Sequence, residues 1–498
     1  MDYAGKKVLV LGLGESGLAM ARWLARCGAS VRVADTREQP ERLPLLQSEV
    51  PSARFQSGPF SEDLLEAVDM IAVSPGLTPE EDLAEILPLA NARHIPIVSE
   101  IELFAHALLS LQEKTGYRPK VVAITGTNGK TTVTSLTARM CARAGKKVTV
   151  AGNISPSVLD VLREALDAQS LPEIWVLELS SFQLWSTDSL NADVAAVLNV
   201  TQDHLDWHKS MAAYADAKAR IFGPATIQVL NRDDPAVMGM ASENRRVVTF
   251  GLDAPLRADD FGIHDNRGMA WLCVMKTHES DMPAAQKNTS LPLEVVMQDL
   301  MPAAALQIRG RHNASNALAA LALCRAIGLP LASLLHALKE YRGEPHRVEL
   351  VMTVSGVSYI DDSKGTNVGA TVAAVEGLGA EKGGDAKRLL LIAGGDGKDQ
   401  DFSPLVLPVS RYVHTVLLIG KDAAVIEAAL KGSGAAMVMC DSLEKAVDEA
   451  AGRAREGDIV LLSPACASMD MFRNYAHRAE VFVSEVREIA LSRGEVVT

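Results

Sequence analysis

Residues 121–132 read VVAITGTNGKTT, an apolar run that passes directly into a glycine-rich turn. Glycines in such a turn let backbone N–H groups surround phosphate oxygens. Lys130 is placed to neutralise the β- and γ-phosphates of a nucleotide, and the Thr131 hydroxyl is a ligand for Mg²⁺. The spacing before Gly-Lys-Thr is shorter than in the standard P-loop. The order of strand, turn and helix nevertheless predicts a nucleotide-phosphate site in a parallel α/β sheet.

Two acidic positions follow later predicted strands. Glu178 lies at the end of the strand 174–179, and Asp203-His204 follows the strand 194–200. Ligands of α/β sheets bind at the carboxyl ends of the strands, and oxygen ligands with one imidazole suit Mg²⁺ or Mn²⁺. A buried histidine is more often a satisfied core residue, but the strand end favours a functional His204. We therefore expect a metal site beside the phosphate loop.

Residues 12–17 read GLGESG, between an apolar strand at 7–13 and a helix from about 16 to 27, and Asp35 closes the next strand. This is the dinucleotide fingerprint, in which the helix N-terminus faces a pyrophosphate. The same geometry suits any nucleoside diphosphate, and a glycine turn can also serve helix–strand packing alone. The motif by itself leaves NAD, another nucleotide and simple packing open.

Length and composition limit the class of protein. A chain of 498 residues with 48% apolar and 22% charged residues predicts a globular protein of about three domains. Its net charge of −13 argues against nucleic acid or an anionic membrane as a partner. The six cysteines are scattered without a CxxC pair, which favours reduced thiols in a cytoplasmic protein. No uncharged apolar stretch is long enough for a membrane span, so we expect a soluble chain.

The alternation of short strands and helices predicts three α/β domains, at residues 1–110, 111–342 and 343–498. We expect an N-terminal Rossmann-like domain, a central P-loop-type ATPase domain and a C-terminal Rossmann-like domain. The polar stretch 112–120 is interpreted as a linker. Residues 253–290 are polar and irregular, which predicts an insertion or hairpins.

Four polar clusters in the last third follow predicted strands or open the domain. They read PHR at 345–347, DDSK at 361–364, GGDGK at 394–398 and SPACAS at 463–468. Basic residues at several strand ends suit a dicarboxylate or a transferring phosphoryl group. A serine nucleophile is not expected, because the chain has no GxSxG elbow.

Together with the GTNGKT loop, five segments carry a family resemblance over nearly the whole chain. They are SPG at 74–76, LELSSFQL at 177–184, NVTQDHLD at 199–206, DSKGTN at 362–367 and LSPACAS at 462–468. The sequence resembles the Mur ligases of peptidoglycan synthesis, and within them the branch that adds D-glutamate. The resemblance implies a cytoplasmic, monomeric, ATP-dependent ligase that joins D-glutamate to UDP-N-acetylmuramoyl-L-alanine through an acyl phosphate, giving ADP and phosphate.

The resemblance also implies the ATP and metal sites. ATP would bind Gly126, Thr127, Asn128, Gly129, Lys130, Thr131 and Thr132, with its adenosine near Asn313, Asn316, Arg347 and Asp362. Two Mg²⁺ ions would bind near Thr131, Glu178, His204 and Lys218. Lys218 matches the lysine that the family carries as a carbamate, which would supply oxygens to the metal. Lys130, Glu178, His204 and Lys218 would be the catalytic residues.

The two remaining substrates are placed by the same resemblance. The UDP group would contact Gly14, Glu15, Ser16, Gly17, Asp35, Thr36, Arg37, Ser74, Pro75 and Gly76, and the muramoyl-alanine arm would contact Asn153, Ser180, Gln183 and His204. D-glutamate would bind Lys364, Thr366, Lys398, Ser468, Met469 and Tyr475. Two residues depart from the family pattern. Glu15 stands where a small or hydroxyl residue is usual, so its carboxylate must point away from the diphosphate. Gly365 replaces an alanine, which would loosen that turn.

Several alternatives remain at this point. A sibling ligase with another amino acid fits most of the motifs, and a folylpolyglutamate synthase fits all but the N-terminal domain. A dehydrogenase with an accessory NTPase domain would explain GLGESG but not the loop at 126–132. A non-catalytic nucleotide sensor would not need basic residues at so many strand ends.

Overall fold

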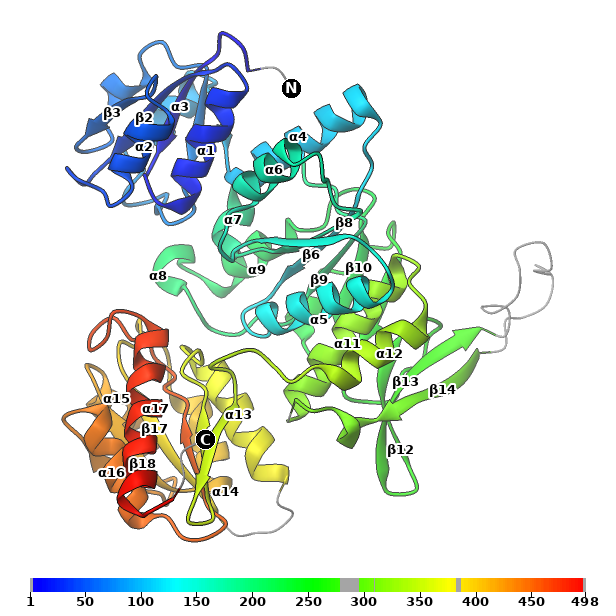
Figure 1. The fold of residues 1–498 in the computed structure, drawn as a ribbon, viewed down its shortest axis with the longest axis vertical. Helices are drawn as coiled ribbons and strands as arrows, with labels where there is room; N and C mark the ends of the chain where they lie inside the picture. The colour runs from blue at the N-terminus through cyan, green and yellow to red at the C-terminus, as the bar shows by residue number, and fades with distance from the viewer. Residues whose placement is uncertain (1–2, 278–294, 309, 382–386, 496–498) are drawn as a thin grey trace.

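The computed structural model describes residues 3–277, 295–308, 310–381 and 387–495. Three α/β units follow one another along the chain, from the first in blue through the second in cyan and green to the third in yellow and red (Figure 1). Each unit is built on its own sheet. The expected class of fold, three α/β domains, is therefore confirmed.

The first unit has five parallel strands in the order β3-β2-β1-β4-β5, the doubly wound arrangement. The strands are β1 (Lys7–Leu11), β2 (Ser30–Asp35), β3 (Arg54–Ser57), β4 (Met70–Val73) and β5 (Ile97–Val98). The α-helices of this unit are α1 (Glu15–Arg26), α2 (Leu43–Glu49) and α3 (Ile86–Ala92). Because β1 and β4 are buried along almost their whole length, they are apolar without alternation, as strands covered on both faces must be.

The second unit has a nine-stranded sheet in the order β14-β13-β12-β11-β10-β9-β6-β8-β7. Its parallel part comprises β6 (Lys120–Thr125), β7 (Val148–Gly152), β8 (Ile174–Glu178), β9 (Val194–Val197), β10 (Ile227–Asn231) and β11 (Val247–Phe250). The helices of this unit are α4 (Glu100–Thr115), α5 (Lys130–Arg143), α6 (Val158–Asp167), α7 (Ser181–Trp185), α8 (Leu205–His208), α9 (Met211–Ala219), α10 (Pro235–Met238), α11 (Arg311–Ala326) and α12 (Leu331–Glu340).

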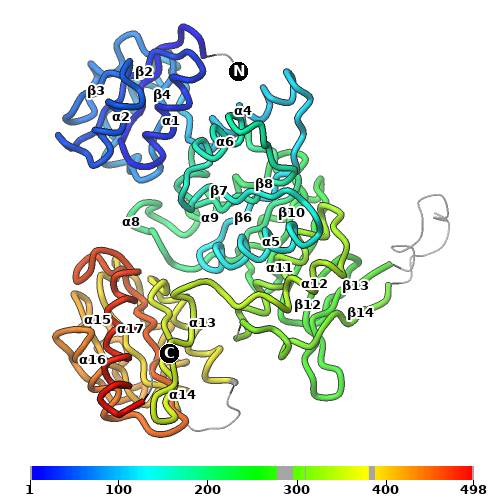
Figure 2. The backbone as a smooth tube through the Cα atoms, in the orientation of Figure 1, coloured from blue at the N-terminus to red at the C-terminus, as the bar shows by residue number. Residues whose placement is uncertain are grey.

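The irregular region of the sequence extends this sheet with antiparallel strands. They are β12 (Phe261–Asn266), β13 (Met269–Thr277) and β14 (Val295–Pro302), and they form the arm that leaves the second unit in Figure 2. The hairpin of β12 and β13 confirms that residues 253–290 contain a hairpin. Residues 278–290 of the expected range lie outside the described residues.

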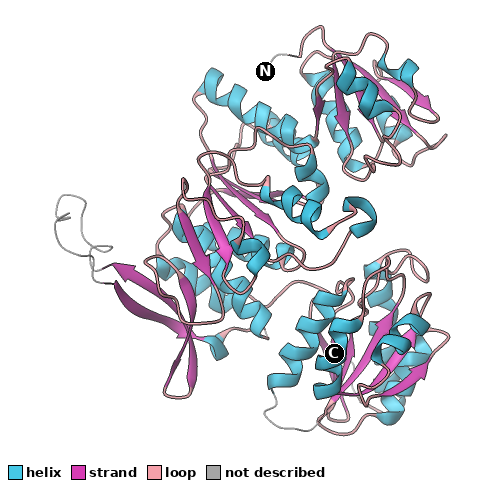
Figure 3. Cartoon of the chain, turned by 180° about the vertical axis from the view of Figure 1, so that it is seen from behind, coloured by secondary structure: helices cyan, strands magenta, loops and turns pink. Residues whose placement is uncertain are grey.

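The third unit has the strand order β15-β16-β20-β17-β18-β19, with only β15 antiparallel. Its strands are β15 (Glu349–Val354), β16 (Val357–Asp361), β17 (Leu389–Gly394), β18 (Val413–Ile419), β19 (Ala436–Met439) and β20 (Ile459–Leu462). Its helices are α13 (Val368–Glu381), α14 (Val406–Tyr412), α15 (Ala423–Leu430), α16 (Leu443–Arg453) and α17 (Tyr475–Ser492). Side chains of β17 alternate between two apolar clusters, because the helices cover both faces of the sheet, as the view from behind shows (Figure 3).

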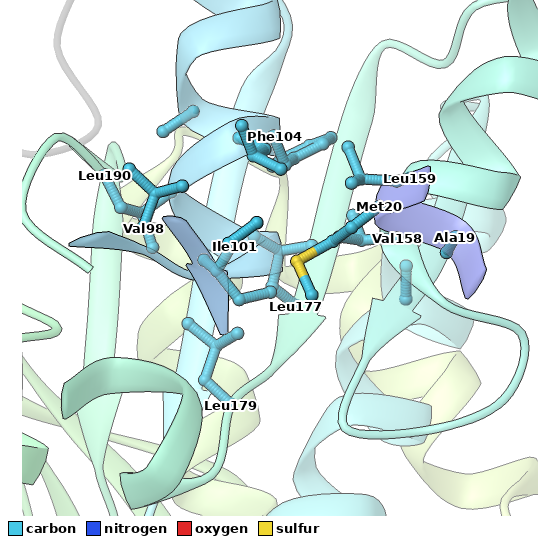
Figure 4. Packing of buried hydrophobic residues seen from close by; sticks show 14 of the residues in the cluster. Ala19, Met20, Val98, Ile101, Phe104, Val158, Leu159, Leu177, Leu179 and Leu190 are labelled. Atoms are coloured by element: carbon cyan, nitrogen blue, oxygen red, sulfur yellow. The ribbon is translucent and has the colours of Figure 1, made fainter. Parts of the chain in front are cut away.

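The first two units share one apolar core. Met20 of α1, Phe104 of α4, Leu159 of α6 and Trp175 of β8 belong to a single cluster, and Figure 4 shows several of its members around α4. The Phe104 and Trp175 rings meet edge to face with centroids 5.0 Å apart. These contacts leave little freedom for the first unit to move against the second.

The interpretation of residues 112–120 as a linker is wrong for its first part. The helix α4 continues to Thr115 and ends at Gly116, which adopts a left-handed φ of 74°. The expected domain boundary at 110–111 therefore falls inside a helix. Sequence polarity suggested a linker because the last turns of α4 are exposed, while its first turns are buried.

The third unit is joined to the second by hydrogen bonds between loops. Asn367 exchanges hydrogen bonds of 3.1 and 3.0 Å with Asn128, and its amide also donates to Asp203 at 3.1 Å. The Arg347 guanidinium donates to the Thr131 hydroxyl at 3.2 Å. The two apolar clusters of this unit draw their residues only from positions 348–490. Among the described residues, none of the helices combines the length and the apolarity that crossing a bilayer requires.

The shared core predicts how single substitutions in α4 act. Phe104→Ala removes an aromatic ring that is wholly buried against Trp175 and should lower the free energy of unfolding by about 3–5 kcal/mol. The matched control Leu109→Ala, on the half-exposed side of the same helix, should change it by less than about 0.5 kcal/mol. Urea denaturation followed by tryptophan fluorescence measures both. Equal midpoints for the two variants would contradict a shared core.

Candidate functional site

The phosphate loop, defined as residues 126–132, joins β6 to α5. Gly129 precedes the first turn of α5 with a φ of +84°, a left-handed conformation that favours glycine. A Cβ atom at this position would lie 2.5 Å from the Asn316 side-chain oxygen. The loop therefore needs glycine both for its backbone conformation and for its close contact with α11.

Two lysines donate to one carbonyl oxygen of this loop. Lys130 Nζ lies 2.9 Å from the carbonyl oxygens of Gly126 and Thr127, and Lys218 Nζ lies 3.0 Å from that of Gly126. Lys218, on α9, is 1% exposed and also lies over the Tyr214 ring at 4.3 Å. Burial lowers the pKa of Lys130, and burial together with the nearby Lys130 charge places the pKa of Lys218 well below its ordinary value.

Glu178 supplies a carboxylate at the end of β8, beside these lysines. It is 3% exposed, and one of its oxygens accepts a hydrogen bond of 3.2 Å from the Asn153 amide. The other oxygen, Oε2, is buried and has no hydrogen-bond partner among the described residues. A buried carboxylate oxygen without a partner is a ready ligand for a cation, so the site fits a divalent metal ion.

His204 precedes α8 in a left-handed backbone conformation with a φ of 54°. Its Nε2 atom lies 3.6 Å from Asp203 Oδ2, and its ring packs edge to face on Phe182. Burial lowers the pKa of the imidazole, and the charges of Lys398 and Lys130 lower it further, against the opposing effect of Asp203. Lys398 belongs to the third unit, so the loops of two units face His204 together.

A cavity of about 600 Å³ lies between the second and third units. Seven of the expected ATP-binding residues line it, namely Asn128, Gly129, Thr132, Asn313, Asn316, Arg347 and Asp362. The other four expected ATP-binding residues do not line the cavity but belong to the adjoining phosphate loop, and they are Gly126, Thr127, Lys130 and Thr131. Sequence reasoning missed Asn231, Phe250 and His312, which also line the cavity. Asn231 and Phe250 are the last residues of the parallel strands β10 and β11, and a strand end was the signal that could have found them.

The strand-end loops of the third unit meet at one edge, since β16, β20 and β17 are neighbours in its sheet. The fully buried Arg478 of α17 joins two of these loops, because its guanidinium donates to the Ser363 carbonyl at 2.8 Å and to the Cys466 carbonyl at 3.2 Å. An isolated antiparallel β-bridge between Asp396 and Ala467 connects the loop after β17 to the loop after β20. Arg478 was not expected to contribute, and an arginine in an apolar helix pattern was the only signal.

Side chains expected to hold the amino acid lie around these loops. Lys364 Nζ lies 5.3 Å from the centre of the Tyr475 ring, and burial lowers the pKa of this lysine to about 8. Ser468 is buried, whereas Met469 is 71% exposed. Thr366 follows Lys364 within the same turn. A Cβ atom at Gly365 would lie 2.6 Å from an Asp362 carboxylate oxygen, so the expectation of a loosened turn is wrong: the turn is tight and glycine fits it.

The residues expected around UDP form a separate cavity of about 330 Å³ in the first unit. Of the residues expected around UDP, only Gly17 does not line this cavity. The cavity is lined by Gly14, Glu15, Ser16, Asp35, Thr36, Arg37, Ser74, Pro75 and Gly76. A Cβ atom at Gly17 would lie 1.9 Å from the Gly12 carbonyl oxygen, so this glycine serves the close packing of α1. Burial opposes ionisation of Asp35, but hydrogen bonds from Arg37 and the Leu13 N–H hold its pKa at about 2.

The residues expected along the muramoyl-alanine arm line neither of these two cavities. Ser180 and Gln183 form the capping box of α7, with hydrogen bonds of 3.2 and 3.0 Å between their side chains and backbones. Asn153 is bonded to Glu178 as described above. Ser180 and Gln183 are therefore engaged in local structure in this state of the chain.

The geometry combines one site for a polyphosphate, one for a nucleoside diphosphate group and one cationic edge for a carboxylate ligand. Lys364 lies close enough to Glu178 and Lys130 for their charges to affect its pKa, although it belongs to another unit. Such an arrangement can bring a nucleotide, an anionic acceptor and an amino acid into one reaction space.

Comparisons with known proteins agree with this arrangement. Residues 6–99 match the family model described as Mur ligase MurD-like, N-terminal domain, residues 124–324 match the Mur ligase middle domain, and residues 346–466 match the Mur ligase glutamate ligase domain. The fold of MurF ligase from Thermotoga maritima, solved in complex with ADP, is similar with a TM-score of 0.59 at 17% identity, over 98% of this chain and 96% of that one.

Two relatives are similar over nearly their full lengths. The UDP-N-acetylmuramoylalanine–D-glutamate ligase of Ralstonia nicotianae is 56% identical, over 99% of each chain. The ligase of the same name from Cupriavidus pinatubonensis is 58% identical, over 98% of each chain. The chain therefore belongs to the Mur ligase family of ATP-dependent ligases.

Proposed function

We propose that this protein is a cytoplasmic ligase that joins D-glutamate to UDP-N-acetylmuramoyl-L-alanine at the expense of ATP, giving ADP and phosphate. The observation that carries the proposal is the approach of two cationic edges from different units. Lys130 lies on the second unit, and Lys364 and Lys398 on the third, within electrostatic reach of Glu178 and His204. The names of the full-length relatives support the choice of substrates.

The binding roles divide among the units. We assign UDP to the first unit, ATP to the second unit with Arg347 and Asp362 of the third, and D-glutamate to the third unit. The cavity of the first unit supports the first assignment, because Asp35, fixed by Arg37, offers acceptors at a cavity of about 330 Å³ that also includes the N-terminus of α1. The cavity at the phosphate loop supports the second, and the joined loops around Lys364 support the third. We expect a monomer, since each substrate finds its residues within one chain.

In the first chemical step the alanine carboxylate of the acceptor attacks the γ-phosphorus of ATP, and the bond to the ADP oxygen breaks. Lys130, released from the Gly126 and Thr127 carbonyls, offsets charge on the phosphoryl oxygens. The neutral imidazole of His204 adds no like charge to the lysines beside it. Mg²⁺, when bound, would stabilise the negative charge that develops on the phosphoryl group.

In the second step the free amine of D-glutamate attacks the acyl carbon, phosphate leaves, and the amine loses a proton. Lys364 and Lys398 would hold the two carboxylates of D-glutamate, with Thr366 and Ser468 as hydroxyl donors. Met469 and Tyr475 flank this position. Because the third unit is joined to the second by loop hydrogen bonds, we expect it to close over the acyl phosphate and exclude water.

We propose that two Mg²⁺ ions are held by Thr131, Glu178, His204 and a carbamylated Lys218, with Mn²⁺ as a substitute. The unpartnered Glu178 oxygen supports a cation at this place. An ammonium at Lys218 would repel it. Carbamylation joins the neutral amine to CO₂ with loss of one proton and turns this cation into an anion. The buried position of Lys218, with its Nζ aimed at the phosphate loop, supports the modification.

The assignment of the first unit predicts a ligand preference. A ligand that binds only the folded state stabilises it and raises the midpoint of thermal unfolding. UDP and UDP-N-acetylmuramoyl-L-alanine should therefore stabilise the protein, by about 2.7 kcal/mol when the ligand concentration is a hundred times its Kd. NAD and NADP should have no effect. A thermal-shift titration measures this. Saturable protection by micromolar NAD would overturn the assignment.

The proposed carbamate predicts the behaviour of Lys218→Ala. This variant should lose about 10²–10³-fold in kcat, since an anionic ligand for Mg²⁺ is removed, and added formate or acetate should restore part by supplying a carboxylate. Lys209→Ala, at an exposed lysine close in sequence, is the matched control and should keep its activity. The measurement is release of phosphate under saturating substrates. A fully active Lys218→Ala enzyme without added acid would refute the carbamate.

The lowered pKa of Lys364 predicts a pH effect on D-glutamate binding. Lys364 is charged below its pKa of about 8 and loses its charge as the pH rises through that value. The KM for D-glutamate should therefore rise above pH 8, and Lys364→Arg, which stays charged, should flatten this rise.

Lys364→Ala tests the same site without titration. It should weaken transition-state binding by about 2–5 kcal/mol, because a substrate carboxylate is left unpaired, while the KM for ATP changes little. If the KM for D-glutamate rose with pH equally in the wild-type and Lys364→Arg enzymes, Lys364 would not be a residue that binds D-glutamate. Equal use of L-alanine and D-glutamate would contradict the proposed substrate but not the ligase chemistry.

A further inference from the structure

Glu15 places a carboxylate at the edge of the cavity in the first unit. It is the first residue of α1, where the positive end of a helix favours an anion. If the cavity holds the UDP group, as proposed above, the diphosphate needs this same helix end. Two like charges at one helix end repel each other unless the side chain is held aside.

Ser155 of the second unit is bonded to this carboxylate. Its hydroxyl donates to Glu15 Oε1 at 2.6 Å, although the two residues lie far apart in the sequence. A hydrogen bond to an ionised carboxylate is stronger than one between neutral groups. Ser155 therefore has the chemistry needed to fix the direction of the Glu15 side chain.

The loop that carries Ser155 is itself held firmly against α1. It leads into α6, whose first residues Val158 and Leu159 are wholly buried in the core shared by the two units. The Leu159 N–H donates to the buried Glu100 carboxylate at 3.3 Å, and Arg22 of α1 donates to Asp160 at 2.7 Å. Ser155 is exposed and lies three residues before this anchored helix, which limits how far its hydroxyl can move from Glu15.

We propose that Ser155 is a positioning residue of the UDP site, which holds the Glu15 carboxylate away from the place of the substrate's diphosphate. Ser155 acts through Glu15 and does not need to touch the substrate. The inference rests on the proposed function of the first unit, and it means that the second unit helps to shape a site lined by residues of the first.

Calorimetric titration of the full-length protein with UDP and with uridine tests the proposal. Ser155→Ala should weaken UDP binding by about three- to tenfold, the value of one hydrogen bond, and leave uridine binding unchanged because uridine has no phosphate. The loss should shrink at high ionic strength, since salt screens the repulsion. Ser155→Thr keeps a hydroxyl and should keep the affinity for UDP. Ser48→Ala, at an exposed serine of the first unit, is the matched control.

A double-mutant cycle isolates the role of Glu15. In the Glu15→Gln background, Ser155→Ala should no longer weaken UDP binding, because the repelling charge is gone. In turnover assays Ser155→Ala should raise the KM for UDP-N-acetylmuramoyl-L-alanine and leave kcat unchanged.

The outcomes separate this inference from the proposed function. If the wild-type protein binds neither UDP nor uridine, the assignment of the cavity fails. If the wild type binds UDP and Ser155→Ala binds it equally well, only the role of Ser155 is overturned. Equal losses for UDP and uridine, or an undiminished loss in the Glu15→Gln background, would show general damage to the loop and would also overturn it.

Discussion

Two buried lysines donate to one backbone carbonyl, that of Gly126, and much of the second unit is arranged around this contact. Placing Lys130 and Lys218 side by side lowers the pKa of Lys218, in addition to the effect of burial. The opposing charges of Glu178 and Asp203 come from the end of β8 and from the loop after β9, the two strands on either side of β6, where the phosphate loop begins. Such a concentration of charge is costly in an apolar core, and it is tolerable here because the strand ends open onto a cavity.

The third unit places its cations by a different means. The buried Arg478 is a common partner of two of its strand-end loops. The guanidinium bonds to backbone carbonyls and a hydroxyl and makes no ion pair with the residues that the structure describes, so burial lowers its pKa to about 10. The rigid donor geometry of arginine lets one side chain fix both the loop of Lys364 and the loop of Ser468.

The three units are connected by two different kinds of contact. A continuous apolar core unites the first two units, and Ser155 of the second reaches Glu15 at the cavity of the first. The third unit meets them through loop hydrogen bonds at Asn367 and Arg347. Breaking a hydrogen bond between units costs little net free energy, because water can replace the partner, whereas separating an apolar core exposes apolar surface at a larger cost. We therefore expect the third unit, and not the first, to move relative to the second.

The sequence alone determined the three α/β units, the phosphate loop and the strand ends that carry the polar clusters. These are local properties, because apolar runs, glycine turns and helix patterns are formed by residues that lie close together in the sequence. It also led to Lys130 and Glu178 as neighbours, since the parallel strands β6 and β8 end at one edge of the same sheet. Only the tertiary structure decided that α4 continues through the expected linker, that Gly17 serves packing, and that Arg478 and Ser155 hold distant loops. Arg478 and Ser155 contact residues more than a hundred positions away in the chain, and such contacts leave no pattern in a single sequence. The end of α4 and the packing of Gly17 are local, but their polar and glycine residues fit a linker and a phosphate turn equally well.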